Sequence, residues 1–159
     1  MKKVISSLFV LAFSVIFFAS CGGKVSSGYE MVSDLRWKKE APFTFNFDVT
    51  KEQLNTPYLL DITLRHHSAM KYASMPFVVT LTTPSGEQKM EGTMKVRDGV
   101  EYVGEAMGDL VDTRFTINED LQLTEEGKYT ISVAHNLADD LPNNVIQVGY
   151  ELLLKEEAK

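Results

Sequence analysis

Cysteine and histidine, two of the most chemically versatile side chains, are scarce in this chain. Of 159 residues, one is cysteine, Cys21, and three are histidine. A single cysteine cannot form a disulfide within the chain, so the stability of the fold must come from packing. His66 and His67 are adjacent, and adjacent side chains of an extended strand point to opposite faces. His135 lies at no recognisable ligand spacing from them, so the sequence predicts no metal site and no bound cofactor.

The chain also lacks a hydrophobic run long enough to cross a bilayer as a helix. Residues 4–19 are mostly apolar but fall short of the roughly 20 residues that a spanning helix needs, so a permanent transmembrane anchor is the weaker interpretation. Lys2 and Lys3 precede the run, and this layout is typical of a secretory signal. The end of the run, FASC, resembles the bacterial lipobox, whose cysteine is lipidated and becomes the first residue after cleavage. We therefore expect residues 1–20 to be a cleaved signal peptide and Cys21 to carry lipid.

Residues 22–28, directly after Cys21, are mostly small. An alternative role for Cys21 is a buried thiol, since free cysteine is often buried. A core residue needs a folded neighbourhood, however, and residues 22–28 have the Gly- and Ser-rich composition of a flexible linker. We expect residues 21–28 to be a lipidated flexible linker and residues 29–159 to form a single domain, which the lipid holds at a membrane.

Basic side chains are outnumbered in the chain. There are 16 lysines and arginines against 22 acidic residues, and removal of Lys2 and Lys3 with the signal leaves 14 against 22. An acidic domain is a poor match for nucleic acid or for direct adhesion to anionic lipid. The 139 residues that remain after cleavage suffice for one domain with a hydrophobic core.

From residue 43 onward the apolar residues recur with a period of two, which is the strand signature. Pro84-Ser85-Gly86 is a turn signal that predicts a hairpin between two of these runs. Seven or eight short strands predict an all-β fold, an antiparallel two-sheet β-sandwich of the Ig-like or jelly-roll-like kind. The side chains that we expect to be buried are Phe45, Phe47, Leu60, Ile62, Leu64, Val79, Leu81, Phe115, Tyr129, Ile131, Val148, Tyr150 and Leu152.

No motif in the chain supports catalysis. The sequence has no calcium-binding loop, no phosphate-cradling glycine loop and no nucleophile elbow. Its neighbouring carboxylates, such as Glu125 and Glu126, stand beside turns, where acidic residues are usually solvated. We expect a protein that is not an enzyme.

Two segments fit protein binding better than chemistry. Met70 and Tyr72, with Met75 nearby, would supply adaptable apolar contacts to a partner, or else fill the edge of the core. In residues 102–110, small side chains recur at every second position and leave one strand face nearly bare, which suits either a docking partner or a bulge. The candidate partner-binding residues are Met70, Tyr72, Tyr102, Gly104, Gly108 and Asp109.

The segment DGVEYVGEAMGDL, residues 98–110, resembles the signature of the gliding-motility lipoprotein H (GldH) family, in which an aromatic residue is followed by spaced glycines and Gly-Asp. Other segments resemble the family in the same order along the chain, together with Cys21 and Trp37. They are residues 58–65, 72–75, 126–130 and 148–150.

This resemblance implies an outer-membrane lipoprotein of Bacteroidetes that faces the periplasm and is associated with gliding motility and its linked secretion system. It implies no catalytic residue. The leading hypothesis is therefore a lipid-anchored, non-enzymatic protein that supports an outer-membrane machine by contacts with outer-membrane or periplasmic proteins. The alternative is a carbohydrate- or ligand-binding surface lipoprotein, for which the one indole, Trp37, supplies no evident aromatic platform.

Overall fold

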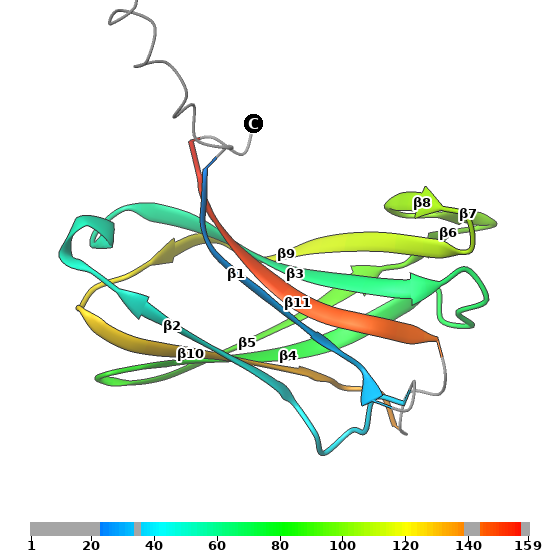
Figure 1. Ribbon diagram of the computed structural model, residues 1–159, viewed down its shortest axis with the longest axis horizontal. Coiled ribbons are helices and arrows are strands. Elements are labelled where there is room, and N and C mark those ends of the chain that lie inside the picture. The colour runs from blue at the N-terminus through cyan, green and yellow to red at the C-terminus, as the bar shows by residue number, and fades with distance from the viewer. Residues whose placement is uncertain (1–22, 34–35, 139–143, 157–159) are drawn as a thin grey trace, which may run out of the picture.

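The structure, a computed structural model, describes residues 23–33, 36–138 and 144–156. Two sheets pack face to face (Figure 1), and all strand pairs are antiparallel. The larger sheet has the order β1 (Lys24–Met31), β11 (Val145–Leu154), β3 (Pro57–His67), β9 (Leu110–Gln122) and β8 (Glu105–Met107). The smaller sheet has the order β2 (Phe43–Val49), β10 (Gly127–His135), β4 (Ser74–Thr83) and β5 (Gly86–Lys95). A two-stranded ribbon, β6 (Arg97–Asp98) and β7 (Glu101–Tyr102), and a 3-10 turn, η2 (Lys51–Gln53), complete the described elements.

The alternation of apolar and polar residues builds the core between the sheets. Along β4, the side chains of Met75, Phe77, Val79 and Leu81 are buried, while the residues between them are not. Because successive side chains of a strand point to opposite faces, each strand contributes its apolar set to one interior. The predicted antiparallel β-sandwich is confirmed.

The predicted hairpin is confirmed as β4 and β5, whose register places Val79 opposite Met90 and closes at Thr83 and Gly86. Most of the side chains expected in the core are buried, but Phe47 and Phe115 are only partly so. Phe115 packs over Gly92 of the edge strand β5, where a Cβ would lie 2.6 Å from its ring. Because β5 lies at the edge of the smaller sheet, it covers Phe115 on one side only, and Phe115 stays partly exposed.

The predicted linker is wrong from Lys24 onward, because β1 begins there and pairs with β11 as far as Met31. Gly28 lets the rings of Phe45 and Tyr150 approach closely, since a Cβ at this position would lie 3.1 Å from each ring. The small residues that looked like a linker are thus an edge strand over aromatic side chains. Cys21 and the predicted signal peptide lie outside the described residues.

Within the described ranges, no helix is long and apolar enough to cross a membrane.

Candidate functional site

The outward surface of the five-stranded sheet is organised in rows that run across its strands. Outward-pointing residues lie opposite one another in the register of β1, β11, β3 and β9. The first row is Met31, Gln147, Arg65 and Asp112, continued by Glu105 on β8. The second row is Tyr29, Gly149, Thr63 and Arg114, and the third is Ser27, Glu151, Asp61 and Thr116. We call this surface the outer face.

An arginine and a carboxylate join two strands in the first row. Arg65 Nε donates a hydrogen bond of 2.6 Å to Asp112 Oδ1, and Arg65 Nη2 donates one of 2.6 Å to Asp112 Oδ2. This hydrogen bonding lowers the pKa of Asp112 below its ordinary value and raises the pKa of Arg65. A bidentate pair of this kind holds both side chains in one orientation.

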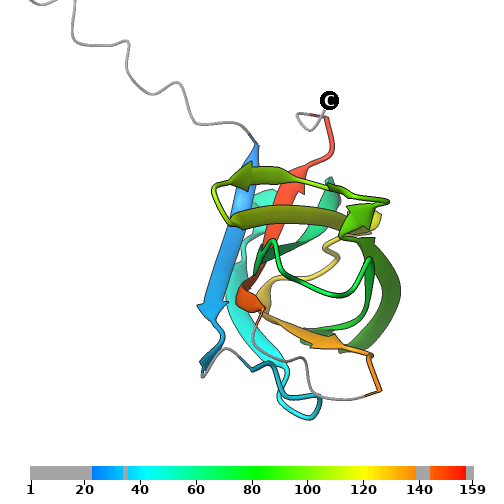
Figure 2. The same ribbon diagram turned by 90° about the vertical axis from the view of Figure 1, so that its right-hand side faces the viewer.

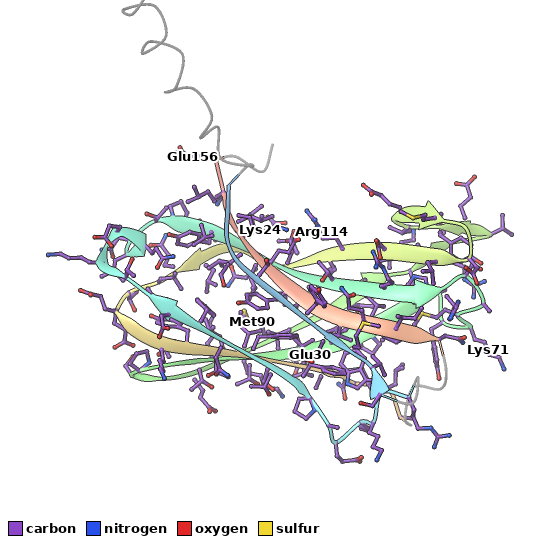
Figure 3. The ribbon with its side chains drawn as sticks, in the orientation of Figure 1. Lys24, Glu30, Lys71, Met90, Arg114 and Glu156 are labelled. Atoms are coloured by element: carbon purple, nitrogen blue, oxygen red, sulfur yellow. The ribbon has the colours of Figure 1, made fainter. Side chains whose placement is uncertain are left out.

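A second set of ion pairs ties four strands together. Arg114 Nη2 lies 2.7 Å from Glu151 Oε2, and its Nε lies 3.7 Å from Asp61 Oδ2. Lys24 pairs with the other oxygen of Glu151, and Figure 3 shows Lys24 and Arg114 on the same side of the sheet. Asp61 is 3% exposed and also accepts a 2.7 Å hydrogen bond from Thr116 Oγ1. The charges of the outer face are therefore held in place by their pairing with one another.

A groove of about 530 Å³ lies over these rows. Gly149 adds no side chain between Tyr29 and Thr63, and a Cβ there would lie 2.6 Å from the carbonyl oxygen of Gly28. The lining includes Thr63, Arg65, Gly104, Glu105, Arg114 and Glu151. The groove is thus mainly polar and carries charges of both signs.

Exposed apolar side chains flank this polar centre. Tyr29 and Met31 on β1 are 66% and 57% exposed, and Met107 on β8 is 78% exposed. Among the described residues, Val100, in the turn between β6 and β7, is the other large apolar side chain that is exposed. β1 and β8 are the two edges of the sheet, so these apolar side chains lie on either side of the strands β11, β3 and β9 that line most of the groove.

The segment of residues 102–110 borders the groove and is held by polar contacts. Tyr102 donates its hydroxyl hydrogen bond to the carbonyl of Ser68. Gly104 adopts φ +131° against β9, where a Cβ would lie 2.9 Å from the carbonyl carbon of Asp112, so its place depends on having no side chain. Gly108 has φ +65° in the turn before β9, with open space around it. The Asp109 side chain is 79% exposed, and its Oδ2 lies 3.6 Å from His67 Nδ1.

The two residues predicted after the histidines are not on the outer face. Met70 is 1% exposed and belongs to the core, which was the other role that the sequence left open for it. Its backbone carbonyl accepts a 2.6 Å hydrogen bond from Arg97 Nη2. Tyr72 is partly buried and packs against the core. Met70 therefore offers no side chain to a partner.

The adjacent histidines point to opposite faces, as an extended chain requires. His66 is fully buried, with Nδ1 2.9 Å from the carbonyl oxygen of His67 and Nε2 3.2 Å from Thr113 Oγ1. Thr113 in turn donates a 2.7 Å hydrogen bond to the carbonyl of Val103. Burial lowers the pKa of His66. The described residues contain no group of three or more histidine, cysteine, aspartate or glutamate side chains that could hold a metal ion.

Sequence reasoning missed the residues that dominate the outer face. Tyr29 and Met31 fell next to the predicted linker, and the Arg65–Asp112 pair joins residues that are far apart in the sequence. The alternation of residues 61, 63 and 65, and of 112, 114 and 116, indicates two polar strand faces. Their partnership depends on the register between β3 and β9, which includes bulges and is not visible in either strand alone.

Comparison with known proteins gives a consistent assignment. Residues 24–152 match the model of the family described as GldH lipoprotein. A "Gliding motility lipoprotein GldH homolog" from Christiangramia forsetii is 27% identical over 131 residues, which cover 80% of this chain and 78% of that protein. Among solved structures, the infectious bursal disease virus VP2 subviral particle matches with a TM-score of 0.28 and 9% identity, over 85% of this chain and 34% of that one. That structural likeness is too low to bear on fold or function. The family match, in contrast, spans nearly all of the described sandwich, and this chain belongs to the GldH lipoprotein family.

Proposed function

We propose that this lipoprotein is a non-enzymatic component of the outer membrane that faces the periplasm and supports gliding motility or the associated secretion machinery through protein contacts. The observation that carries the proposal is the outer face, where exposed apolar side chains lie at both edges of the sheet and a groove between these edges carries fixed charges of both signs. Lipid on Cys21 would hold this face near the membrane. Family membership supports the association with a membrane and with gliding motility.

The composition of the outer face suits a protein partner. Protein interfaces combine apolar anchors, with aromatic residues, methionine and arginine enriched among them, and polar groups that fix the register. Tyr29, Met31 and Met107 supply the anchors, while Arg65 and Arg114 supply the polar groups. Because the ion pairs already order the arginines, binding loses less side-chain entropy than it would with free arginines.

The segment of residues 102–110 contributes to the same surface in two ways. Gly104 brings the backbone against β9 at the end of the groove, and Gly108 turns the chain back into the sheet. Asp109 presents an exposed carboxylate beside that turn, and the Tyr102 hydroxyl ties the segment to the carbonyl of Ser68, in the loop between β3 and β4. We propose that a partner contacts Asp109 and Met107, while the two glycines and Tyr102 shape the segment.

The alternative of a carbohydrate-binding protein has less support. Trp37, the one indole in the chain, is 1% exposed and packs against the rings of Phe43, Phe77 and His135. It therefore cannot stack against a sugar without a rearrangement of the core. The exposed surface favours protein docking instead.

The proposal is tested by the substitution Met107→Glu in the full-length protein, expressed in its native membranes. Val100→Glu is the matched control, because it adds the same charge at another exposed apolar position, in the turn between β6 and β7, which lies outside the five-stranded sheet. We expect Met107→Glu to lose co-purifying membrane proteins, and with them gliding or secretion, while its melting temperature and membrane level stay those of the wild type. Equal recovery of the same partners with both variants and the wild type would contradict docking on this face.

A further inference from the structure

β1 is an edge strand of the larger sheet, so one of its two sides has no neighbouring strand in that sheet. β1 pairs with β11 on one side and forms the border of the five-stranded sheet, as Figure 2 shows. Val32, directly after β1, donates a 2.9 Å hydrogen bond to Ile146. Because such bonds alternate along an antiparallel pair, Ser27, Tyr29 and Met31 direct their backbone N–H and C=O groups away from β11. No residue of the described ranges hydrogen-bonds those outward groups.

The other sheet edges are better protected against an added strand. Natural proteins protect edges by charged side chains, by very short strands, by proline, by bulges or by covering the edge. β5 carries a row of charged side chains, and β8 has three residues. β2 exposes the polar residues Thr44, Asn46 and Asp48. β1 has eight residues. Its bulge and Lys24 stand at its start, whereas from Ser27 onward its outward side chains include the exposed Tyr29 and Met31.

We propose that an extended segment of a partner protein adds to β1 as a sixth strand of the larger sheet. This inference rests on the proposed function and names the mode of recognition. The outward backbone groups of Ser27, Tyr29 and Met31 pair with the backbone of the added strand, which supplies affinity with little dependence on its sequence. Selectivity comes from the side chains opposite Tyr29 and Met31, where aromatic or β-branched residues form favourable cross-strand pairs.

The length of chain before β1 indicates where this partner lies. Three residue steps separate Cys21 from Lys24, and an extended chain covers at most about 3.6 Å per residue. A lipid on Cys21 therefore holds the start of β1 within roughly 11 Å of its anchor point. The proposed occupant is thus a segment that a membrane protein, or another lipoprotein, presents at the bilayer surface.

A second copy of this chain fits the edge less well. An antiparallel pair of β1 strands would place the two Lys24 residues at opposite ends of an eight-residue ribbon, on the order of 24 Å apart. Both anchors could then reach one bilayer only with the ribbon lying flat along it. An added strand from a different protein meets no such restriction.

Photo-cross-linking in native membranes tests the proposal. Full-length, lipidated protein carries p-benzoylphenylalanine at position 27, 29 or 31, one position at a time, and the linked peptides are identified by mass spectrometry. We expect all three positions to link to one segment of one partner. The linked residue should move by about two along the partner for each step of two along β1, because both chains are extended.

A proline substitution supplies the second arm of the test. Ser27→Pro removes an outward N–H and leaves the bonds to β11 intact, a position where edge strands tolerate proline. The control Ser27→Thr keeps the N–H and adds only a methyl group. We expect the cross-link from position 31 to fall at least tenfold with Ser27→Pro and to stay unchanged with Ser27→Thr. If the proline variant proves unfolded by its melting curve, the pattern of the three cross-links decides alone.

The outcomes separate this inference from the proposed function. Cross-links from β1 that scatter over several proteins, or that map to a second copy of this chain, would overturn strand addition by a partner. The same cross-linker is placed at position 107 as a probe of the outer face away from β1. A partner that cross-links from position 107 but not from β1 would retain docking on the outer face and reject the added strand. Absence of any protein cross-link from position 107 and from β1 would reject both.

Discussion

Gly104 approaches the backbone of Asp112 so closely that no side chain fits between them. A Cβ at Gly104 would lie 2.9 Å from the carbonyl carbon of Asp112 and closer still to its oxygen. The backbone φ of +131° is also one that residues with side chains rarely adopt. The glycine pattern of residues 102–110 therefore has a structural cause at this position, whatever a partner does nearby.

We predict that Gly104→Ala lowers the free energy of unfolding by about 3 kcal/mol or more, because overpacking and an unfavourable φ act together. Gly108→Ala should cost only about 1–2 kcal/mol, since it shares a positive φ but has open space around it. Urea unfolding of both variants measures the difference. Similar losses for the two positions would show that the contact with Asp112 is not what constrains Gly104.

A second prediction concerns acid stability and depends on His66. Burial lowers the pKa of His66 in the folded protein, partly opposed by the carbonyl of His67 and by Asp112, while the charge of Arg97 acts with burial. The unfolded chain therefore binds more protons just below the ordinary histidine pKa of about 6.5. The stability that the protein gains by burying a neutral His66 ring is therefore fully present above about pH 6.5. It is lost as the pH falls from there toward the lower pKa of His66 in the folded protein.

We expect the urea midpoint of the wild type to fall between pH 7.5 and pH 5.5, and the fall to be smaller in His66→Gln. His67→Gln is the matched control, because His67 is partly exposed and lies on the opposite face. This variant keeps the buried ring of His66, so its urea midpoint should fall more than that of His66→Gln. An identical fall in all three proteins would assign the acid sensitivity to other groups.

The core supplies a third prediction. Ile62 is fully buried in the central strand β3, so Ile62→Ala should cost about 2–5 kcal/mol. Val100→Ala, at a position that is 91% exposed, should change stability by less than about 0.5 kcal/mol. Thermal or urea unfolding checks both. A small effect of Ile62→Ala would mean that the sheets are packed loosely around β3.

Most of the strands could be predicted from the sequence because each of them carries its own alternating signal. Leu60, Ile62 and Leu64 alternate with polar residues and are buried as expected. β1 carried no such signal, since it lacks large apolar residues pointing inward and its pairing with β11 joins opposite ends of the chain. Met70 was ambiguous for a similar reason, because its place is set by contacts that are distant in the sequence, such as the hydrogen bond that its carbonyl accepts from Arg97. The site depends on register, which no single strand encodes.

A fourth prediction separates the ordering of charges from their contribution to stability. Arg65 and Asp112 form a bidentate pair, yet their side chains are 40% and 46% exposed, and solvent screens such pairs strongly. A double-mutant cycle with Arg65→Gln and Asp112→Asn should give a coupling energy of no more than about 1 kcal/mol near neutral pH. The coupling should vanish as the pH falls through the lowered pKa of Asp112, where the carboxylate becomes protonated. A coupling that persists in acid would mean that it does not come from the ion pair.

The last prediction concerns the anchor that places the sandwich at a membrane. The basic start, the apolar run and the small residues before Cys21 predict lipid on that cysteine, and family membership supports a lipoprotein. We expect Cys21→Ser to abolish labelling by a clickable fatty acid and to leave a soluble protein or an uncleaved precursor. Equal labelling of the variant and the wild type would place the lipid elsewhere or exclude it.

The matched control for this anchor is a longer tether. Inserting about ten Gly and Ser residues between Gly23 and Lys24 preserves Cys21 and the start of β1, so labelling and membrane level should not change. The added chain lengthens the reach of the domain by roughly 15–20 Å by random-coil scaling. If a partner meets the edge of β1 at the bilayer surface, this insertion should weaken its recovery while Cys21→Ser eliminates it. Full recovery with the long tether would show that closeness to the membrane is not required for the contact.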